Sequence, residues 1–372
     1  MLQFDKLLPC NLKDANQIID GFLDNQAKNM DPATNVRQLA ERYKIRVVHL
    51  PMLAIPMFQI PDVNDTERQL PPSQQSTVAA SILLACSAAG DLQATLQILY
   101  AVYYSSNAYN IPKAAEIARL FTPKDISDCR SMLEQLAEGN DGKPEAKGDA
   151  NAMTLHAKFL ELAGEKQKAR YFYDKALERY STKLYRGYPH PMALPWLTPW
   201  TELANFERVS DTPRLEKIVE SLRFGALKAD DPMAYYKLTT FTTEHSSKWL
   251  EYMTKAAASG HPEAMYKLGR FYLEANNHAS VFLNSPGFRK ALKFLVSWGP
   301  NATAKFGIEW LQAAGLGGHK PALMELAQLH EKEGAKEQAK DCLRAVANDS
   351  LGDVPDEWSY LVRKARQRLA AL

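Results

Sequence analysis

A short motif that recurs in the second half of the chain constrains the fold more than any other feature. The segment Asp231-Pro-Met-Ala-Tyr-Tyr-Lys-Leu238 returns 30 residues later as His261-Pro-Glu-Ala-Met-Tyr-Lys-Leu268. A weaker copy is His319-Lys-Pro-Ala-Leu-Met-Glu-Leu326. Motifs that repeat at such a period are typical of arrays in which one supersecondary unit packs on the next. We therefore expect a repeat architecture in this part of the chain.

Helix start and stop signals surround the copies. Asp231 can cap a helix whose first turn contains Pro232, and Pro262 takes the same position in the second copy. Gly260 marks the end of the preceding helix. A small residue follows each start, which lets two helices approach closely, at Ala234, Ala264 and Ala322. The pattern predicts an all-α fold of antiparallel helical hairpins, with helices over more than half of the residues.

The second copy carries a family resemblance. Its segment Lys255-Ala-Ala-Ala-Ser-Gly-His-Pro-Glu-Ala-Met-Tyr-Lys-Leu-Gly269 resembles the signature of Sel1-like repeats, in which an alanine pair precedes Gly-His, then Ala and Leu-Gly. Ala313-Ala314 with Gly318-His319 resembles the signature again. That copy has one extra residue before the glycine, and Ala327 replaces the family glycine. The resemblance implies an α-solenoid, because stacked hairpins bury faces that a single hairpin leaves exposed.

Residues 150–183 resemble a tetratricopeptide repeat, which has a similar architecture. The small and aromatic positions of that family are occupied by Ala157, Gly164, Ala169, Tyr173 and Ala176. The usual tryptophan and terminal proline are replaced by Met153 and Ser181. By this pattern Asn151, Thr154 and Lys158 lie on the concave face of the first helix. They do not reproduce the arrangement that grips a free C-terminal carboxylate, so we expect an internal segment or a folded surface as the partner.

The remaining segments complete the predicted organisation. Residues 1–72 form an N-terminal region with helices near 12–28 and 33–46 and a proline-rich extended stretch, Val47 to Ile60. Helical hairpins follow over 73–137, and 138–149 is a polar, glycine-containing linker. An insertion rich in proline and aromatic residues spans 184–204. Sel1-like repeats cover 205–372, with an inserted helix near 286–298, because Ala264 and Ala322 are 58 residues apart.

Charge and cysteine content restrict the partners. The net charge of +2 is nearly neutral, so a nucleic-acid binder needs a local basic patch. Basic clusters at 37–46 and 363–368 are interpreted as solvated helix faces. The four cysteines are widely spaced, and they predict neither a zinc site nor a disulfide framework. Without a secretory signal or a long apolar run, we expect no membrane span and an intracellular location, cytoplasmic or mitochondrial.

The sequence lacks the motifs of the common catalytic classes. His330-Glu331 begins a zinc-protease pattern, but Gly334 stands where the second ligand is required. There is no phosphate-binding glycine loop and no Gly-x-Ser-x-Gly nucleophile elbow. His261 and His319 occupy the Sel1 turn position, where capping explains them. We therefore expect a protein that is not an enzyme, needs no cofactor or metal, and has no small-molecule substrate.

These observations favour a scaffold, adaptor or assembly factor that binds another protein through the solenoid groove. Tyr188, Trp196 and Trp200 of the insertion are candidate partner contacts, since Tyr and Trp are frequent interface anchors. The other interpretation is that these rings pack against neighbouring hairpins. Two other functions remain open: an RNA-binding helical-repeat protein, and a regulatory or docking subunit of an enzyme complex.

Overall fold

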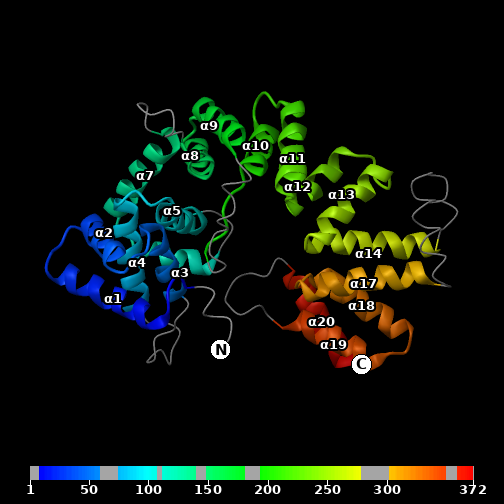
Figure 1. The fold of residues 1–372 in the computed structure, drawn as a ribbon. Coiled ribbons are helices and arrows are strands. Elements are labelled where there is room, and N and C mark those ends of the chain that lie inside the picture. Colours follow the sequence, from blue (N-terminus) through cyan, green and yellow to red (C-terminus); the bar gives the residue numbers. More distant parts are fainter. Residues whose placement is uncertain are drawn as a thin grey trace. The chain divides into compact units, whose positions relative to one another are not determined.

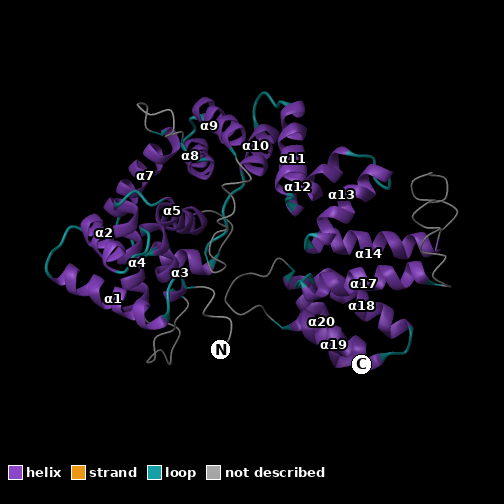
Figure 2. Ribbon diagram, in the orientation of Figure 1, coloured by secondary structure: helices purple, strands orange, loops and turns teal. Residues whose placement is uncertain are grey.

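The structure is a computed structural model that describes residues 8–58, 74–106, 111–139, 148–180, 193–277, 301–348 and 358–371. Within these ranges it contains 18 α-helices and no strand, and 80% of the residues are helical (Figure 2). This confirms the all-α class that the helix signals predict. None of the described helices is long and apolar enough to cross a bilayer. The chain divides into two compact units, Met1–Glu202 and Leu203–Leu372.

Unit 1 is arranged around the central helix α5 (Leu92–Ser106). This helix packs against four others, and every residue from Ala94 to Ala101 is buried. A helix that is apolar on all sides belongs in a protein interior. The other described helices of unit 1 are α1 (Leu12–Ala27), α2 (Pro32–Arg42), η2 (Val47–His49), α3 (Pro51–Met57), α4 (Gln74–Ala88), α6 (Pro112–Ala118), α7 (Pro123–Glu138), α8 (Ala150–Leu162), α9 (Lys166–Arg179) and the start of α10 (Pro199–Val209) (Figure 1).

The proline-rich stretch near residue 50 is helical, so the extended conformation predicted for it is wrong. Pro51 begins α3, where its missing N–H is not required, and Pro56 lies inside the same short helix. Leu53 and Ile55 are buried, and α3 packs against α4. Burial of these apolar side chains outweighs the single backbone hydrogen bond that Pro56 removes.

Two predicted hairpins of unit 1 turn at glycines. Gly90 joins α4 to α5 with φ of +88°, and Gly164 joins α8 to α9 with φ of +83°. Other residues rarely adopt this left-handed conformation, so glycine ends the first helix of each pair at little cost. The alanines noted at 157, 169 and 176 are all fully buried in the α8–α9 hairpin.

In unit 2, each helix from α11 onward packs against the next described helix of the chain. The described elements are α11 (Leu215–Ala229), α12 (Pro232–Leu238), η4 (Thr239–Phe241), α13 (Ser247–Ala258), α14 (Pro262–Asn277), α17 (Ala302–Leu316), α18 (Lys320–Lys332), α19 (Lys336–Ala347) and α20 (Ser359–Ala371) (Figure 1). The inserted helix expected near 286–298 lies outside the described residues, as does most of the 138–149 linker.

Helices α14 and α17 of unit 2 approach each other closely. Gly269 and Gly307 face each other there, and a Cβ added to Gly269 would lie 2.9 Å from the Gly307 carbonyl oxygen. A Cβ on Gly307 would lie 2.8 Å from the Gly269 carbonyl oxygen. Real Cβ atoms essentially never approach this closely, so both positions need glycine to keep the helices in contact.

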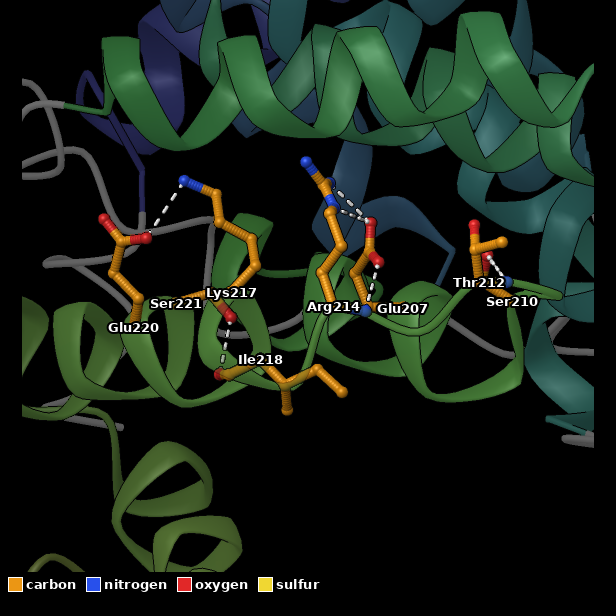
Figure 3. Close-up of polar contacts among 8 residues, drawn as sticks. All are labelled: Glu207, Ser210, Thr212, Arg214, Lys217, Ile218, Glu220 and Ser221. Carbon is orange, nitrogen blue, oxygen red and sulfur yellow. Dashed lines mark hydrogen bonds and ion pairs between the residues drawn. The ribbon is translucent and has the colours of Figure 1, made fainter.

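A partly buried ion pair fixes the turn between α10 and α11 (Figure 3). The Glu207 carboxylate is fully buried, and the Arg214 guanidinium binds one of its oxygens through two nitrogens, with Nε at 2.9 Å. The backbone N–H of Arg214 donates to the other oxygen at 3.1 Å. The carboxylate is thus satisfied by a cation and a peptide group, so we interpret it as a structural element of the hairpin.

Candidate functional site

The recurrent motif places an N-cap residue at the start of α12, α14 and α18. Asp231 accepts the Met233 N–H through its carboxylate at 2.9 Å. The two histidines use a ring nitrogen instead. Nδ1 of His261 accepts the Ala264 N–H at 3.2 Å, and Nδ1 of His319 accepts the Ala322 N–H at 3.3 Å. Each cap satisfies a backbone donor that the helix start leaves open.

The residue before each cap has a positive φ. Gly260 and Gly318 have φ of +95° and +82°, and Asp230 has φ of 52° in the degenerate copy. Aspartate tolerates this left-handed conformation better than most residues, which explains how Asp230-Asp231 replaces Gly-His. Ala234, Ala264 and Ala322 lie three residues after the caps and are completely buried.

Equivalent positions of successive copies touch one another. The ring of Tyr236 on α12 stacks on His261 at the start of α14, with centroids 4.4 Å apart. The equivalent tyrosine of the next copy, Tyr266, meets His319 at the start of α18, with centroids 4.8 Å apart. Helices α12, α14 and α18 each begin with one copy of the motif, and we call them the first helices of their hairpins. Contacts between their side chains therefore form a continuous series from α12 to α18.

Charged side chains extend this series. Lys267 Nζ donates to the Tyr236 hydroxyl at 2.7 Å and lies 5.0 Å from the centre of its ring. Arg270 stands over Tyr266 at 5.9 Å, and its Nε lies 3.9 Å from a Glu325 carboxylate oxygen. We define the first-helix face as the partly buried residues Tyr236, His261, Glu263, Tyr266 and Glu325, the exposed Lys267 and Arg270, and the buried His319.

The face is electrostatically mixed. A hydrogen bond from His319, at 2.7 Å, is the main cause of a lowered pKa for Glu263. Burial alone would lower the pKa of Lys267, but the Tyr236 hydroxyl and Glu263 raise it above its ordinary value. Both cations, Lys267 and Arg270, lie within 4.0 Å of carboxylates. The face therefore does not form the uninterrupted basic stripe that an RNA-binding groove requires.

His319 is poorly suited to acid–base catalysis. Because Nδ1 of His319 accepts a backbone hydrogen bond, the proton of the neutral ring resides on Nε2, which donates to Glu263. His319 is only 3% exposed, so neither nitrogen is available to a substrate. Within the described residues, no group of three or more His, Cys, Asp or Glu side chains is placed to hold a metal ion.

The cysteines of the described ranges are all free thiols. Burial raises the pKa of Cys86 and of Cys129, with nearby aspartates adding to the effect. Thiols in such surroundings are poor nucleophiles, because the reactive thiolate form is disfavoured.

The three residues that the tetratricopeptide pattern places on a concave face do not form an open surface. Thr154 is fully buried, and its hydroxyl donates to the Ala150 carbonyl oxygen at 2.7 Å. This part of the prediction is wrong, because α8 packs against α5 and α7 as well as α9, so helices cover the face that was expected to be open. Asn151 is half-buried.

Lys158 belongs to a largely buried polar cluster that the sequence did not reveal. Its Nζ lies 3.1 Å from a Glu161 oxygen and 3.2 Å from a Glu202 oxygen, and the Tyr173 hydroxyl donates to Glu161 at 2.8 Å. Burial opposes the charge of Lys158, but the two carboxylates raise its pKa. Burial and the same carboxylates raise the pKa of Tyr173. Glu202 lies far along the chain, so no local spacing could predict the cluster.

The described end of the proline- and aromatic-rich insertion packs on α5. Gln97 accepts the Leu194 N–H at 3.1 Å, and the Tyr104 hydroxyl donates to the Pro195 carbonyl at 2.8 Å. Trp200 is 2% exposed and meets Tyr180 edge-on at 4.8 Å. Its assignment as a partner contact is wrong, because a buried ring cannot meet a partner.

Trp196 is partly buried against the core of unit 1. Tyr188 lies outside the described residues. The packing interpretation therefore accounts for the described part of the insertion.

Comparison with known proteins adds no family assignment. No protein-family model matches the chain. No curated protein matches it at a significant level.

Proposed function

We propose that this protein is a non-catalytic scaffold that binds another protein through the first-helix face of unit 2. The supporting observation is the series of contacts between equivalent residues of successive copies, which aligns Tyr236, Tyr266, Lys267 and Arg270 along α12 and α14. The hairpins act as stacked Sel1-like units of a solenoid in this proposal.

The contacts hold the side chains of the face in place before a partner arrives. Tyrosine and arginine are enriched among the residues that contribute most to protein–protein affinity. Side chains that neighbouring residues already immobilise lose less conformational entropy on binding. The face thus combines favoured residue types with preorganisation, and its paired charges suit a partner surface of mixed charge.

The test compares two matched double variants of the full chain. Lys267→Ala with Arg270→Ala removes a cation pair from the face on α14. Lys340→Ala with Arg344→Ala removes a lysine and an arginine from α19, and each of these also pairs with a carboxylate on its own helix. Circular dichroism first establishes that both variants keep the helical content of the unmodified protein.

Affinity purification with mass spectrometry, with and without nuclease, then measures which proteins are recovered. We expect the α14 variant to lose a protein that the unmodified chain and the α19 variant both retain. Equal recovery with both variants contradicts the proposed face. Recovery that nuclease abolishes favours RNA as the partner instead.

A further inference from the structure

A cavity of about 480 Å³ opens in unit 1 where α1, α2 and α7 surround α4. Both α2 and α7 pack on α4, and small residues of α4, including Ala85 and Ala88, line the space between them. Because these side chains are short, they do not fill the gap that the flanking helices leave. The volume lies within the range typical of pockets for small ligands.

The walls of the cavity are mainly apolar, and Gln26, Asn35, Ser81 and Ser87 add neutral polar groups to the lining. Phe22 of α1, Met30 of the α1–α2 turn and Met132 of α7 line it. Methionine side chains adapt to the shape of a ligand, and their sulfur atoms make favourable contacts with aromatic rings. The walls therefore suit an aromatic body rather than a strongly hydrated one.

Two carboxylate side chains make one side of this cavity acidic. Asp125 and Asp128 of α7 line the cavity, and none of the described lining residues is a lysine or an arginine. Asp125 is held in place because one of its oxygens accepts the Thr122 N–H at 2.8 Å and the Thr122 hydroxyl at 2.7 Å. Asp128 is exposed at this side of the cavity.

We propose that this cavity binds a small organic cation in which an ammonium group is joined to an aromatic body. The aromatic body contacts Phe22 and the two methionines, and the ammonium group faces Asp128. This site is separate from the first-helix face and does not depend on the scaffold function proposed for it.

The test uses three probes of similar size: phenethylammonium, the neutral 2-phenylethanol and the anionic phenylacetate. The full chain is labelled with ¹³C at its methionine methyl groups, and Met30→Leu and Met132→Leu identify the two signals of the cavity. We expect saturable shifts of both signals, with the ammonium probe binding about two- to fivefold more tightly than the alcohol, as for a solvent-accessible ion pair. Phenylacetate is expected to bind most weakly.

Three variants separate the charge from the cavity. Asp128→Asn removes the preference for the cation, whereas Asp24→Asn, an exposed position of α1 outside the lining, retains it. Ala88→Phe fills the space from an exposed position and abolishes the shifts for all probes. The absence of saturable shifts in the unmodified protein, equal affinity for amine and alcohol, or a cation preference that survives Asp128→Asn would each overturn the proposal.

Discussion

The glycine pair between α14 and α17 allows a quantitative test of the packing in unit 2. Replacing Gly269 by alanine adds a methyl group 2.9 Å from the Gly307 carbonyl oxygen and 2.9 Å from Leu311 Cγ. The carbonyl is part of a helix backbone, so relief requires the two helices to separate. Overpacking of this kind costs about 1–3 kcal/mol, whereas alanine gains about 1 kcal/mol over glycine in helix propensity.

The net expectation for Gly269→Ala is a loss of up to about 2 kcal/mol, or up to about 8 °C in the melting temperature of a unit of this size. Gly21→Ala in α1 is the matched control, because its added methyl group meets only the movable Leu39 side-chain methyl, at 3.1 Å. This control is expected to be neutral or to stabilise unit 1. Calorimetry and urea denaturation measure both variants.

The double variant Gly269→Ala with Gly307→Ala sharpens the test. Once the helices have separated to admit one methyl group, the second costs less, so the combined loss is smaller than the sum of the single losses. If Gly269→Ala stabilises the protein as much as Gly21→Ala does, the close approach of α14 and α17 is refuted.

Three further predictions concern the described side chains. Lys158→Ala leaves the buried Glu202 and the partly buried Glu161 without their cation and is expected to cost about 3 kcal/mol in urea denaturation. Lys168→Ala, in an exposed pair, is expected to leave the stability almost unchanged, and similar losses for the two variants would contradict the burial of the cluster. The pKa of Glu263 is lower in the folded protein than in the unfolded chain, where it is about 4.3. The ionised carboxylate therefore stabilises the folded protein above the unfolded pKa, and this contribution is lost as the pH falls through the lower folded pKa. Glu263→Gln should therefore flatten the fall in melting temperature as the pH decreases below the unfolded pKa of about 4.3, and an unchanged slope would argue against the contact with His319. Trp200→Ala is expected to cost about 3–5 kcal/mol, and an unchanged melting temperature would show that this ring is not packed.

The sequence by itself was sufficient for the all-α class and for several helix starts. Helix signals act locally: Asp231 caps the helix expected after it, and the helical hairpins turn at Gly90 and Gly164. Such features need only the residues within one turn of the chain. The structural role of a turn glycine or of a capping side chain can therefore be predicted from the sequence alone.

Tertiary packing decided the features that depend on distant residues. The burial of Thr154 and Trp200 follows from which helices cover them, and Lys158 meets Glu202 only after α8 and α10 are brought together. The helical conformation around Pro56 likewise depends on packing against α4. The cavity of unit 1 exists because α2 and α7 share α4 as a support, and the facing of Gly269 and Gly307 depends on how two helices cross. Local propensity contributes a few tenths of a kcal/mol to about 1 kcal/mol per residue, whereas burial of one large side chain contributes about 1.5–3 kcal/mol, so contacts between distant segments determine where each side chain lies.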